Sequence, residues 1–106
     1  MKKISVVIPM YYEEAVAEEC YNRMYEVLKN IENYEYEIVF VNDGSKDKTL
    51  EILENISKKD SNIKIVSFSR NFGHQAAVTA GIQYVTGDAV VIIDADLQDP
   101  PELIPE

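Results

Sequence analysis

The sequence predicts an α/β domain in which helices cover both faces of a parallel sheet, giving three layers. Short apolar runs rich in β-branched residues alternate with longer segments of helical periodicity, in the order βαβαβαβ. No repeat, linker or low-complexity segment interrupts this alternation. Strands joined by connections of this length run parallel with right-handed crossovers, so we expect a single domain over residues 1–106.

The first part of the chain is expected to supply two strands with a helix between them. Residues 4–8 form a β-branched run that Pro9 closes, and residues 36–41 form the second strand. Residues 13–32 have the apolar spacing of an amphipathic helix, with acidic residues near its N-terminal end, where they favour the helix dipole. Cys20 lies on the apolar stripe, so we interpret it as a core residue rather than a reactive thiol.

The second helix is expected to follow a cluster of turn-forming residues, with Ser45 or Asp47 as its N-cap. Its core-facing residues are expected to be Leu50, Leu53 and Ile56. Residues 63–68 then alternate apolar and polar side chains, which is typical of a strand at the edge of a sheet.

The last helix and strand lead into a group of acidic residues. Residues 74–85 are predicted to form a helix that approaches the sheet closely through small residues, and Gly87 is expected to be its C-terminal stop. The expected core face of this helix is Ala77, Ala80, Gly81, Tyr84 and Val85. Residues 90–93 form an unbroken apolar run, as expected of a strand covered on both faces in a parallel sheet.

The edge character of the third strand predicts a Rossmann-like sheet of order 3-2-1-4, numbered along the chain. In such sheets, ligands bind beyond the carboxyl ends of the strands, near the point where the strand order reverses. A polar cluster follows each predicted strand at this edge: residues 9–14, 42–45, 69–74 and 94–99.

Asp94 and Asp96 are the candidate ligands of a divalent cation. In extended chain, residues two apart project to the same side, so both carboxylates can converge where the last strand ends. Gln98 adds a neutral oxygen nearby, and such hard oxygen ligands suit Mg²⁺ or Mn²⁺. The alternative is an acidic turn that follows a core strand and binds nothing.

Composition excludes several classes of protein. Ten basic and nineteen acidic residues give a net charge of −9, so a nucleic-acid partner is not expected. A single cysteine forms no internal disulfide, and no leader of signal-peptide type opens the sequence, which favours a cytoplasmic setting. The longest apolar runs are much shorter than the roughly 20 residues of a membrane-spanning helix.

A nucleotide-diphosphate donor site agrees with these clusters. The sequence has neither a G-x-G-x-x-G fingerprint nor a P-loop, so a diphosphate would be held largely by metal, while Asp43 could accept hydrogen bonds from a base or ribose. Two alternatives are a non-catalytic, flavodoxin-like module that binds a nucleotide or metal, and a nucleotidyltransferase. The second would be expected to carry a Gly-rich, basic loop where this chain has PMYYEE.

Four motifs together resemble those of the family 2 glycosyltransferases of the GT-A fold. They are IPMYYEE, FVNDGSKDKT, FSRNFGHQAAVTAGI and DADLQDPPE, beginning at residues 8, 40, 68 and 94. The chain is most similar to the polyprenyl-phosphate glycosyltransferases, a group that includes dolichol-phosphate mannosyltransferases and bactoprenol glucosyltransferases. The resemblance implies that residues 1–106 are the donor-binding, N-terminal half of a GT-A domain, truncated before the acceptor-binding half.

The resemblance also implies roles for particular residues. The nucleotide would be bound by Pro9, Tyr11, Glu13, Asp43 and Asp94. The metal would be bound by Asp94, Asp96 and Gln98, with Asp96 as the catalytic residue. The chain departs from the family pattern at Tyr12, where Asn is usual, and at Asn42, where Asp is usual.

The implied reaction is transfer of a sugar, with inversion, from a nucleotide-diphosphate sugar to a polyprenyl phosphate. A UDP-sugar is favoured over GDP-mannose as the donor. The full-length protein would work at the cytoplasmic face of the membrane, which it would meet through its C-terminal part. The 106-residue chain alone is expected to bind nucleotide weakly and to transfer no sugar.

Two further residues have less specific signals. His74, the only histidine, lies at the start of a predicted helix and could meet a phosphate, although a surface or capping role is the simpler interpretation. Arg70 could bind a phosphate or pair with an acid at the same edge of the sheet.

Overall fold

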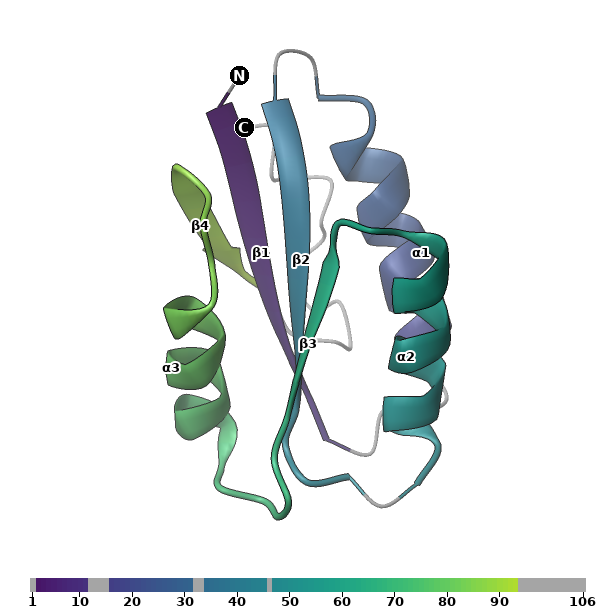
Figure 1. The fold of residues 1–106 in the computed structure, drawn as a ribbon, viewed down its shortest axis with the longest axis vertical. Coiled ribbons are helices and arrows are strands. Elements are labelled where there is room, and N and C mark those ends of the chain that lie inside the picture. The colour runs from purple at the N-terminus through teal and green to yellow at the C-terminus, as the bar shows by residue number, and fades with distance from the viewer. Residues whose placement is uncertain (1, 12–15, 32–33, 46, 94–106) are drawn as a thin grey trace.

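Strands and helices alternate along the described chain, as the sequence predicts. The computed structural model describes residues 2–11, 16–31, 34–45 and 47–93. The elements are β1 (Lys2–Met10), α1 (Ala17–Leu28), β2 (Tyr34–Asn42), α2 (Thr49–Lys59), β3 (Ile63–Ser67), α3 (His74–Gln83) and β4 (Ala89–Ile92) (Figure 1). The sheet has the order β3-β2-β1-β4 and every pairing is parallel, which confirms the predicted order.

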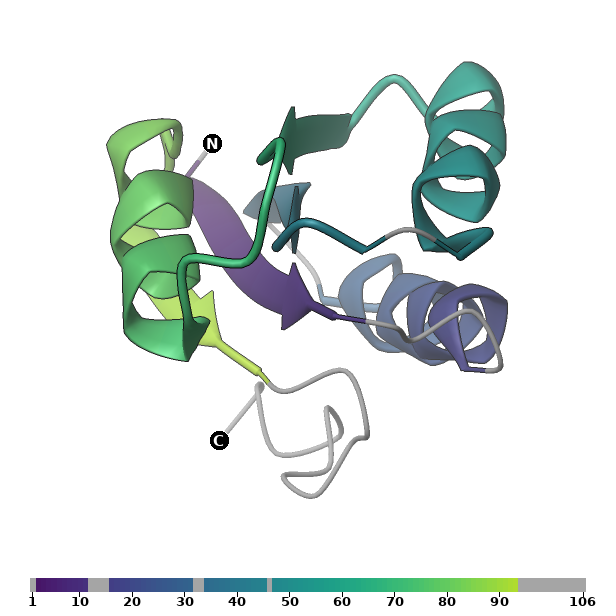
Figure 2. The same cartoon turned by 90° about the horizontal axis from the view of Figure 1, so that it is seen from below.

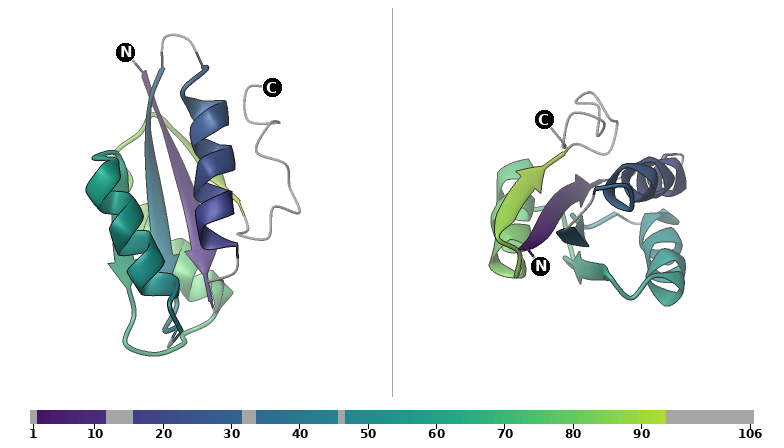
Figure 3. Two further views of the ribbon diagram at one scale, coloured as in Figure 1. Left: turned by 90° about the vertical axis from the view of Figure 1, so that its right-hand side faces the viewer. Right: turned by 90° about the horizontal axis from the view of Figure 1, so that it is seen from above.

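Three layers arise because the strands are apolar on both faces. Helices α1 and α2 pack on one face and α3 packs on the other (Figure 2). The left view of Figure 3 faces this side of the sheet, and β1 and β2 are visible between α1 and α2. The larger core lies under these two helices and includes Phe40, Met24 and Cys20, all fully buried. The smaller core joins Val7, Val39 and Val41 of the sheet to α3. Cys20 is thus a core residue, as predicted.

Helix α1 is shorter at its C-terminal end than the sequence predicts. It ends at Leu28, whereas the expected helix continued to residue 32. The side-chain amide of Asn30 donates to the backbone oxygen of Glu26 at 2.7 Å, and the chain continues as a turn. A side chain that competes for a helix carbonyl in this way favours termination. The predicted start at Glu13 lies outside the described residues.

Asp47 binds the first residue of α2, Thr49. Its Oδ1 atom accepts hydrogen bonds from the backbone N–H of Thr49 at 3.0 Å and from the Thr49 hydroxyl at 2.6 Å. The N-cap residue of α2 is Lys48, which makes no side-chain capping bond, so neither of the two predicted caps occupies that position. The backbone N–H of Ser45 donates to the Asn42 side chain. Leu53 and Ile56 are buried as expected, while Leu50 is half-buried.

The predictions for the end of α3 are wrong. The helix ends at Gln83, before the expected stop at Gly87, and Tyr84, expected in the core, is 55% exposed. Gly87 serves a different purpose, because a β-carbon there would lie 2.3 Å from the Ser5 hydroxyl of β1. The glycine therefore allows the chain that enters β4 to pass close to β1.

Strand β4 is not covered on both faces by the described residues, contrary to expectation. Val90 and Ile92 are 42% and 43% exposed, whereas Ile93 is buried. Val91 packs against the larger core, so its neighbours in the strand point to the face on which α3 lies. Helix α3 covers Val7 of β1 and the valines of β2, and it leaves Val90 and Ile92 of β4 uncovered.

A buried acid joins three strands and the α3–β4 connection. Glu37 is 2% exposed. One of its carboxylate oxygens accepts hydrogen bonds from the Ser5 hydroxyl at 2.7 Å and from the backbone N–H and hydroxyl of Thr86 at 2.6 and 2.8 Å. The other oxygen is 2.9 Å from the ammonium of Lys64. Burial alone would raise the Glu37 pKa, but the contacts with Lys64, Thr86 and Ser5 outweigh it and lower the pKa from 4.5 to about 2.

A second carboxylate ties the helices to the sheet at its amino edge. Asp60 accepts hydrogen bonds from the hydroxyls of Tyr21 and Tyr36, each at 2.8 Å, and from the backbone N–H of Asn62 at 2.9 Å. Burial opposes ionisation of Asp60, yet these donors lower its pKa. Burial and the bond to Asp60 raise the Tyr36 pKa to about 12. At neutral pH, Asp60 is therefore ionised, and the hydroxyls of Tyr21 and Tyr36 that donate to it keep their protons.

Replacing Gly81 with valine is expected to destabilise the fold by about 1–3 kcal/mol. A β-carbon at this position would lie 2.5 Å from Val7 Cγ1 and 3.1 Å from Val41 Cγ2. Chemical denaturation measures the loss. Gln75→Val, at an exposed position in the same helix, is the matched control and is expected to change stability by less than about 0.5 kcal/mol. Valine has a higher helix propensity than glycine, so a loss in Gly81→Val reports the contact with the sheet, and unchanged stability in this variant would contradict the close packing of α3.

Candidate functional site

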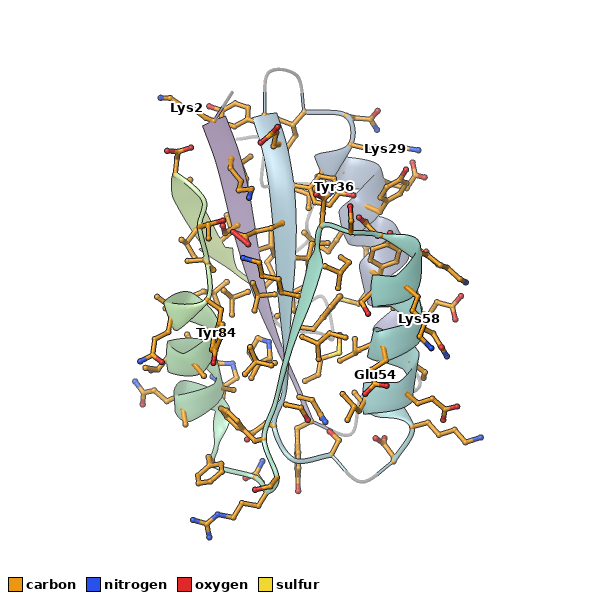
Figure 4. The ribbon with its side chains drawn as sticks, viewed as in Figure 1. Lys2, Lys29, Tyr36, Glu54, Lys58 and Tyr84 are labelled. Carbon is orange, nitrogen blue, oxygen red and sulfur yellow. The ribbon has the colours of Figure 1, made fainter. Side chains whose placement is uncertain are left out.

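The ends of β1 and β2 and the segments that follow β2 and β3 lie together at the carboxyl edge of the sheet, the lower edge in Figure 1. The backbone N–H of Asp43 donates to the oxygen of Met10 at 2.8 Å, and the N–H of Phe68 donates to the oxygen of Asn42 at 2.9 Å. Lys2, Lys29 and Tyr36, labelled in Figure 4, lie toward the opposite end. The structure thus places the predicted residues Pro9, Tyr11 and Asp43 at one edge.

Asp43 binds the segment that precedes α3. Asp43 is only 3% exposed. Oδ1 accepts a hydrogen bond from the backbone N–H of Phe72 at 2.8 Å, and Oδ2 accepts from the Asn71 amide at 2.9 Å and from the N–H of Gly73 at 3.1 Å. The Asn71 amide also approaches the backbone oxygen of Asp43 at 3.3 Å. Sequence analysis assigned Asp43 to the nucleoside and missed this connection.

Gly44 brings two backbones into contact beside Asp43. It has a φ of 75°, and a β-carbon there would lie 2.2 Å from the carbonyl carbon of Arg70 and 2.4 Å from the nitrogen of Asn71. A side chain would therefore meet main-chain atoms that have little freedom to move. Glycine is required here both for the backbone conformation and for the close approach of the two loops.

Asn42 occupies a position where the family that this sequence resembles usually has an aspartate. Its side-chain oxygen accepts a hydrogen bond from the N–H of Ser45 at 3.2 Å, and its amide donates to the Ser67 hydroxyl at 3.3 Å. The residue is 1% exposed. The neutral amide thus supplies both a donor and an acceptor inside the protein, and Asp43 remains the acid of this motif.

Arg70 has a partner that sequence analysis did not consider. Its guanidinium carbon lies 4.6 Å from the centroid of the Phe72 ring, and Phe68 meets the same ring edge-on at 5.3 Å and 84°. The spacing of Arg and Phe two residues apart in a loop is the only sequence signal of this contact. His74 is the first residue of α3 and is exposed.

The predicted metal ligands Asp94, Asp96 and Gln98, and the predicted nucleotide ligand Glu13, lie outside the described residues. Among the residues that the structure describes, no group of three or more His, Cys, Asp or Glu side chains could hold a metal ion. The N–H of Ile93 donates to the oxygen of Val7 at 3.1 Å, so the chain reaches residue 93 beside the carboxyl end of β1. The metal site stays a prediction.

Comparison with known proteins identifies the family of this chain. Residues 5–106 match the family described as Glycosyl transferase family 2. The chain belongs to this family. The strand order and alternating helices are those of the N-terminal half of a GT-A fold, as expected from the resemblance.

Similar proteins occur in bacteria and their phages. The chain is 57% identical over 102 residues to a glycosyltransferase of Bacillus subtilis named YkcC, covering 96% of this chain and 31% of that protein. It is 47% identical over 103 residues to the bactoprenol glucosyl transferase of Shigella phage SfX, covering 97% of this chain and 33% of the relative. The chain therefore spans about a third of the length of these relatives.

Solved glycosyltransferases share the architecture. The mannosyltransferase PcManGT of Pyrobaculum calidifontis, in complex with GDP-Man and Mn²⁺, matches 90% of this chain with a TM-score of 0.77 and 26% identity; the match covers 28% of the mannosyltransferase. TarS of S. aureus, in complex with UDP-GlcNAc, matches 89% with a TM-score of 0.78 and 28% identity, covering 26% of TarS.

Among the described residues, no helix has the length and apolar character needed to cross a bilayer.

Proposed function

We propose that this family 2 chain is the donor-binding part of a glycosyltransferase. The full-length enzyme would transfer a sugar from a nucleotide-diphosphate sugar to a polyprenyl phosphate at the cytoplasmic face of the membrane, with inversion at the anomeric carbon. The observation that carries the proposal is the meeting of the end of β1 with the segments after β2 and β3 at the carboxyl edge, in a sheet whose β4 precedes Asp94 and Asp96 in the sequence.

The relatives support the classes of donor and acceptor. Proteins similar to this chain are named bactoprenol glucosyl transferases, which favours a lipid phosphate as the acceptor. Two solved neighbours bind GDP-Man and UDP-GlcNAc, so both kinds of base occur among similar structures. We favour a UDP-sugar as the donor.

A divalent cation, Mg²⁺ or Mn²⁺, fits the donor set that follows β4. Asp94, Asp96 and Gln98 would hold it, since they offer the hard oxygen ligands that these ions prefer. When bound, the ion supplies charge that stabilises the departing nucleoside diphosphate. The pairing of β4 with β1 supports this placement, because it directs β4 to the carboxyl edge where β2 also ends.

The remaining roles follow from the charge of the acceptor and from the greater length of the relatives, of which this chain spans about a third. A lipid phosphate is already anionic, so its attack on the sugar needs little help from a general base. The motifs assigned to the donor all lie within residues 8–102. The acceptor would be bound by sequence outside the 106 residues, and the chain alone would bind nucleotide weakly and transfer no sugar.

Sugar transfer tests this function directly. The protein at its natural length is incubated with UDP-glucose or GDP-mannose, a polyprenyl phosphate and Mn²⁺, and the glycolipid and its anomeric configuration are determined. We expect transfer from the UDP-sugar with inversion, and loss of transfer when the metal is chelated. Metal-dependent nucleotide binding without transfer to any polyprenyl phosphate would instead support the non-catalytic binding module.

A further inference from the structure

Strand β4 carries little information about its own register in the sheet. It has four residues, and in the part of the chain that the structure describes it pairs with β1 alone. Residues 90–93 are all valine or isoleucine, so a shift of one or two positions along β1 would still place an apolar side chain on each face. The register of β4 must therefore be fixed by contacts other than its own apolar pattern.

Polar contacts bind residues 86–88, which lead into β4, to the strands beside them. The backbone N–H of Gly87 donates to the Ser5 hydroxyl of β1 at 2.9 Å. The N–H of Asp88 donates to the oxygen of Lys3 at 2.7 Å, and the N–H of Lys3 donates back to the Asp88 side chain at 2.9 Å. Each of these bonds joins one residue of the connection to one residue of β1, and so opposes a shift of β4 along the sheet.

Glu37 of β2 is at the centre of these contacts. One of its carboxylate oxygens accepts hydrogen bonds from the Ser5 hydroxyl at 2.7 Å and from the N–H and hydroxyl of Thr86 at 2.6 and 2.8 Å. Ser5 is paired with Glu37 on one side and with Val90 of β4 on the other. A shift of β4 would take Thr86 away from a carboxylate that is 2% exposed, and a buried acceptor without its donors is costly.

We propose that Glu37 is a positioning residue for the cation, because it sets the register of β4 on β1 and thereby the place where Asp94 and Asp96 follow. This inference rests on the proposed function, which assigns the cation to these two acids. Asp94 is two positions beyond Ile92, the last residue of β4. A shift of one residue moves a strand by about 3.3 Å and turns its side chains to the opposite face. A shifted β4 would therefore not present the two carboxylates to the same point.

The dissociation constant of Mn²⁺ in the presence of UDP, measured on the full-length protein, tests this role. Glu37→Ala removes the acceptor and allows shifted registers. If only about a tenth of the molecules keep the native register, the apparent dissociation constant rises about tenfold, and we expect a rise of at least this size. Without metal, the amides of Asp88 and Ile93, which donate to β1, should lose protection against hydrogen exchange relative to those of β2.

Two control variants separate register from charge and from stability. Glu37→Gln removes the same charge but keeps an acceptor oxygen for Ser5 and Thr86, and should retain most of the Mn²⁺ affinity. Leu53→Ala lowers stability through the larger core, in a helix that contacts β2 and β3, and should leave Mn²⁺ affinity unchanged. All affinities are measured under conditions in which circular dichroism shows that the variant is folded.

Ser5→Ala is a milder second variant. It removes the acceptor of the Gly87 N–H and one donor to Glu37, and leaves the carboxylate bound to Thr86. The dissociation constant of Mn²⁺ should rise in the same direction as in Glu37→Ala. In the double variant the two effects should not add, because both residues act through the same connection.

The outcomes are distinct. Unchanged Mn²⁺ affinity in Glu37→Ala, or in Ser5→Ala where only that variant folds, would overturn the positioning role. Equal losses in Glu37→Ala and Glu37→Gln would assign the effect to charge, and an equal loss in Leu53→Ala would assign it to stability; either result would overturn the role as well. A wild-type protein that binds no Mn²⁺ with UDP would overturn both this inference and the metal site, while sugar transfer would still decide the proposed function separately.

Discussion

Replacing Asp96 with alanine is expected to lower the kcat of sugar transfer by at least about 100-fold. The residue is one of two carboxylates proposed to hold the cation, and it follows the strand that pairs with β1. Losing one carboxylate weakens metal binding and removes charge stabilisation from the departing diphosphate, which matters most in the transition state. The initial rate at saturating UDP-sugar and Mn²⁺ measures the effect.

Asp99→Ala is the matched control for Asp96. Asp99 lies in the same acidic segment but outside the Asp-x-Asp pair. Its replacement should leave the rate within about threefold, because a nearby acid that binds no metal contributes only through screened charge. Equal rates for the Asp96 variant and the wild-type protein would refute the metal site. Mn²⁺ binding in the presence of UDP, measured in parallel, should be lost with Asp96→Ala and kept with Asp99→Ala.

Replacing Glu37 with alanine is expected to reduce the free energy of unfolding by about 3 kcal/mol. The change removes the acceptor for the Ser5 hydroxyl and for two donors of Thr86, and it leaves the ammonium of Lys64 without its carboxylate. Lys64 is partly exposed and can be hydrated, which keeps the loss near the lower end for a buried ion pair. Glu35→Ala, at an exposed position of the same strand, should have little effect.

The effect of Glu37 on stability should depend on pH. Its pKa is 4.5 in the unfolded chain and about 2 in the folded protein. Folding therefore favours the ionised form, so the stabilisation is complete above about pH 4.5 and is lost as the pH falls toward 2. The difference in stability between the wild-type protein and Glu37→Gln, measured by denaturation from pH 7 downward, should shrink over this interval. A constant difference would mean that ionisation of Glu37 does not contribute.

The periodicity of the sequence was sufficient to predict the sheet. Local patterns gave the wrong end for α3 and the wrong burial for β4. Strand order followed from the alternation of elements and the polar residues of β3. The apolar spacing of α3 continues through Tyr84, yet the helix ends one residue earlier and the tyrosine points to solvent. The run at residues 90–93 reads as a strand covered on both faces, but coverage depends on neighbours that a local apolar run cannot specify.

The candidate site was predictable in position and not in its contacts. Asp43 follows an apolar strand, so its place at the carboxyl edge could be inferred from the order of elements. Its partners come from residues 71–73, about thirty positions along the chain, and hydrogen bonds between two loops have no periodic signal. Glu37 was missed for the same reason, since an acid in a strand reads as solvent-facing unless Ser5 and Thr86 are known to meet it.

The contacts between β1 and the start of β4 have a consequence for the order of folding. The backbone N–H of Lys3 donates to the Asp88 side chain across 85 residues, and Gly87 donates to the Ser5 hydroxyl across 82. Closing so long a loop is entropically costly, and non-local pairings of parallel strands form slowly. We therefore expect β1, β2 and the Asp43 loop to acquire protection against hydrogen exchange before β4 docks. A ligand that contacts residues on both sides of β1 would then bind only to molecules in which β4 has docked. Its binding would slow the undocking of β4.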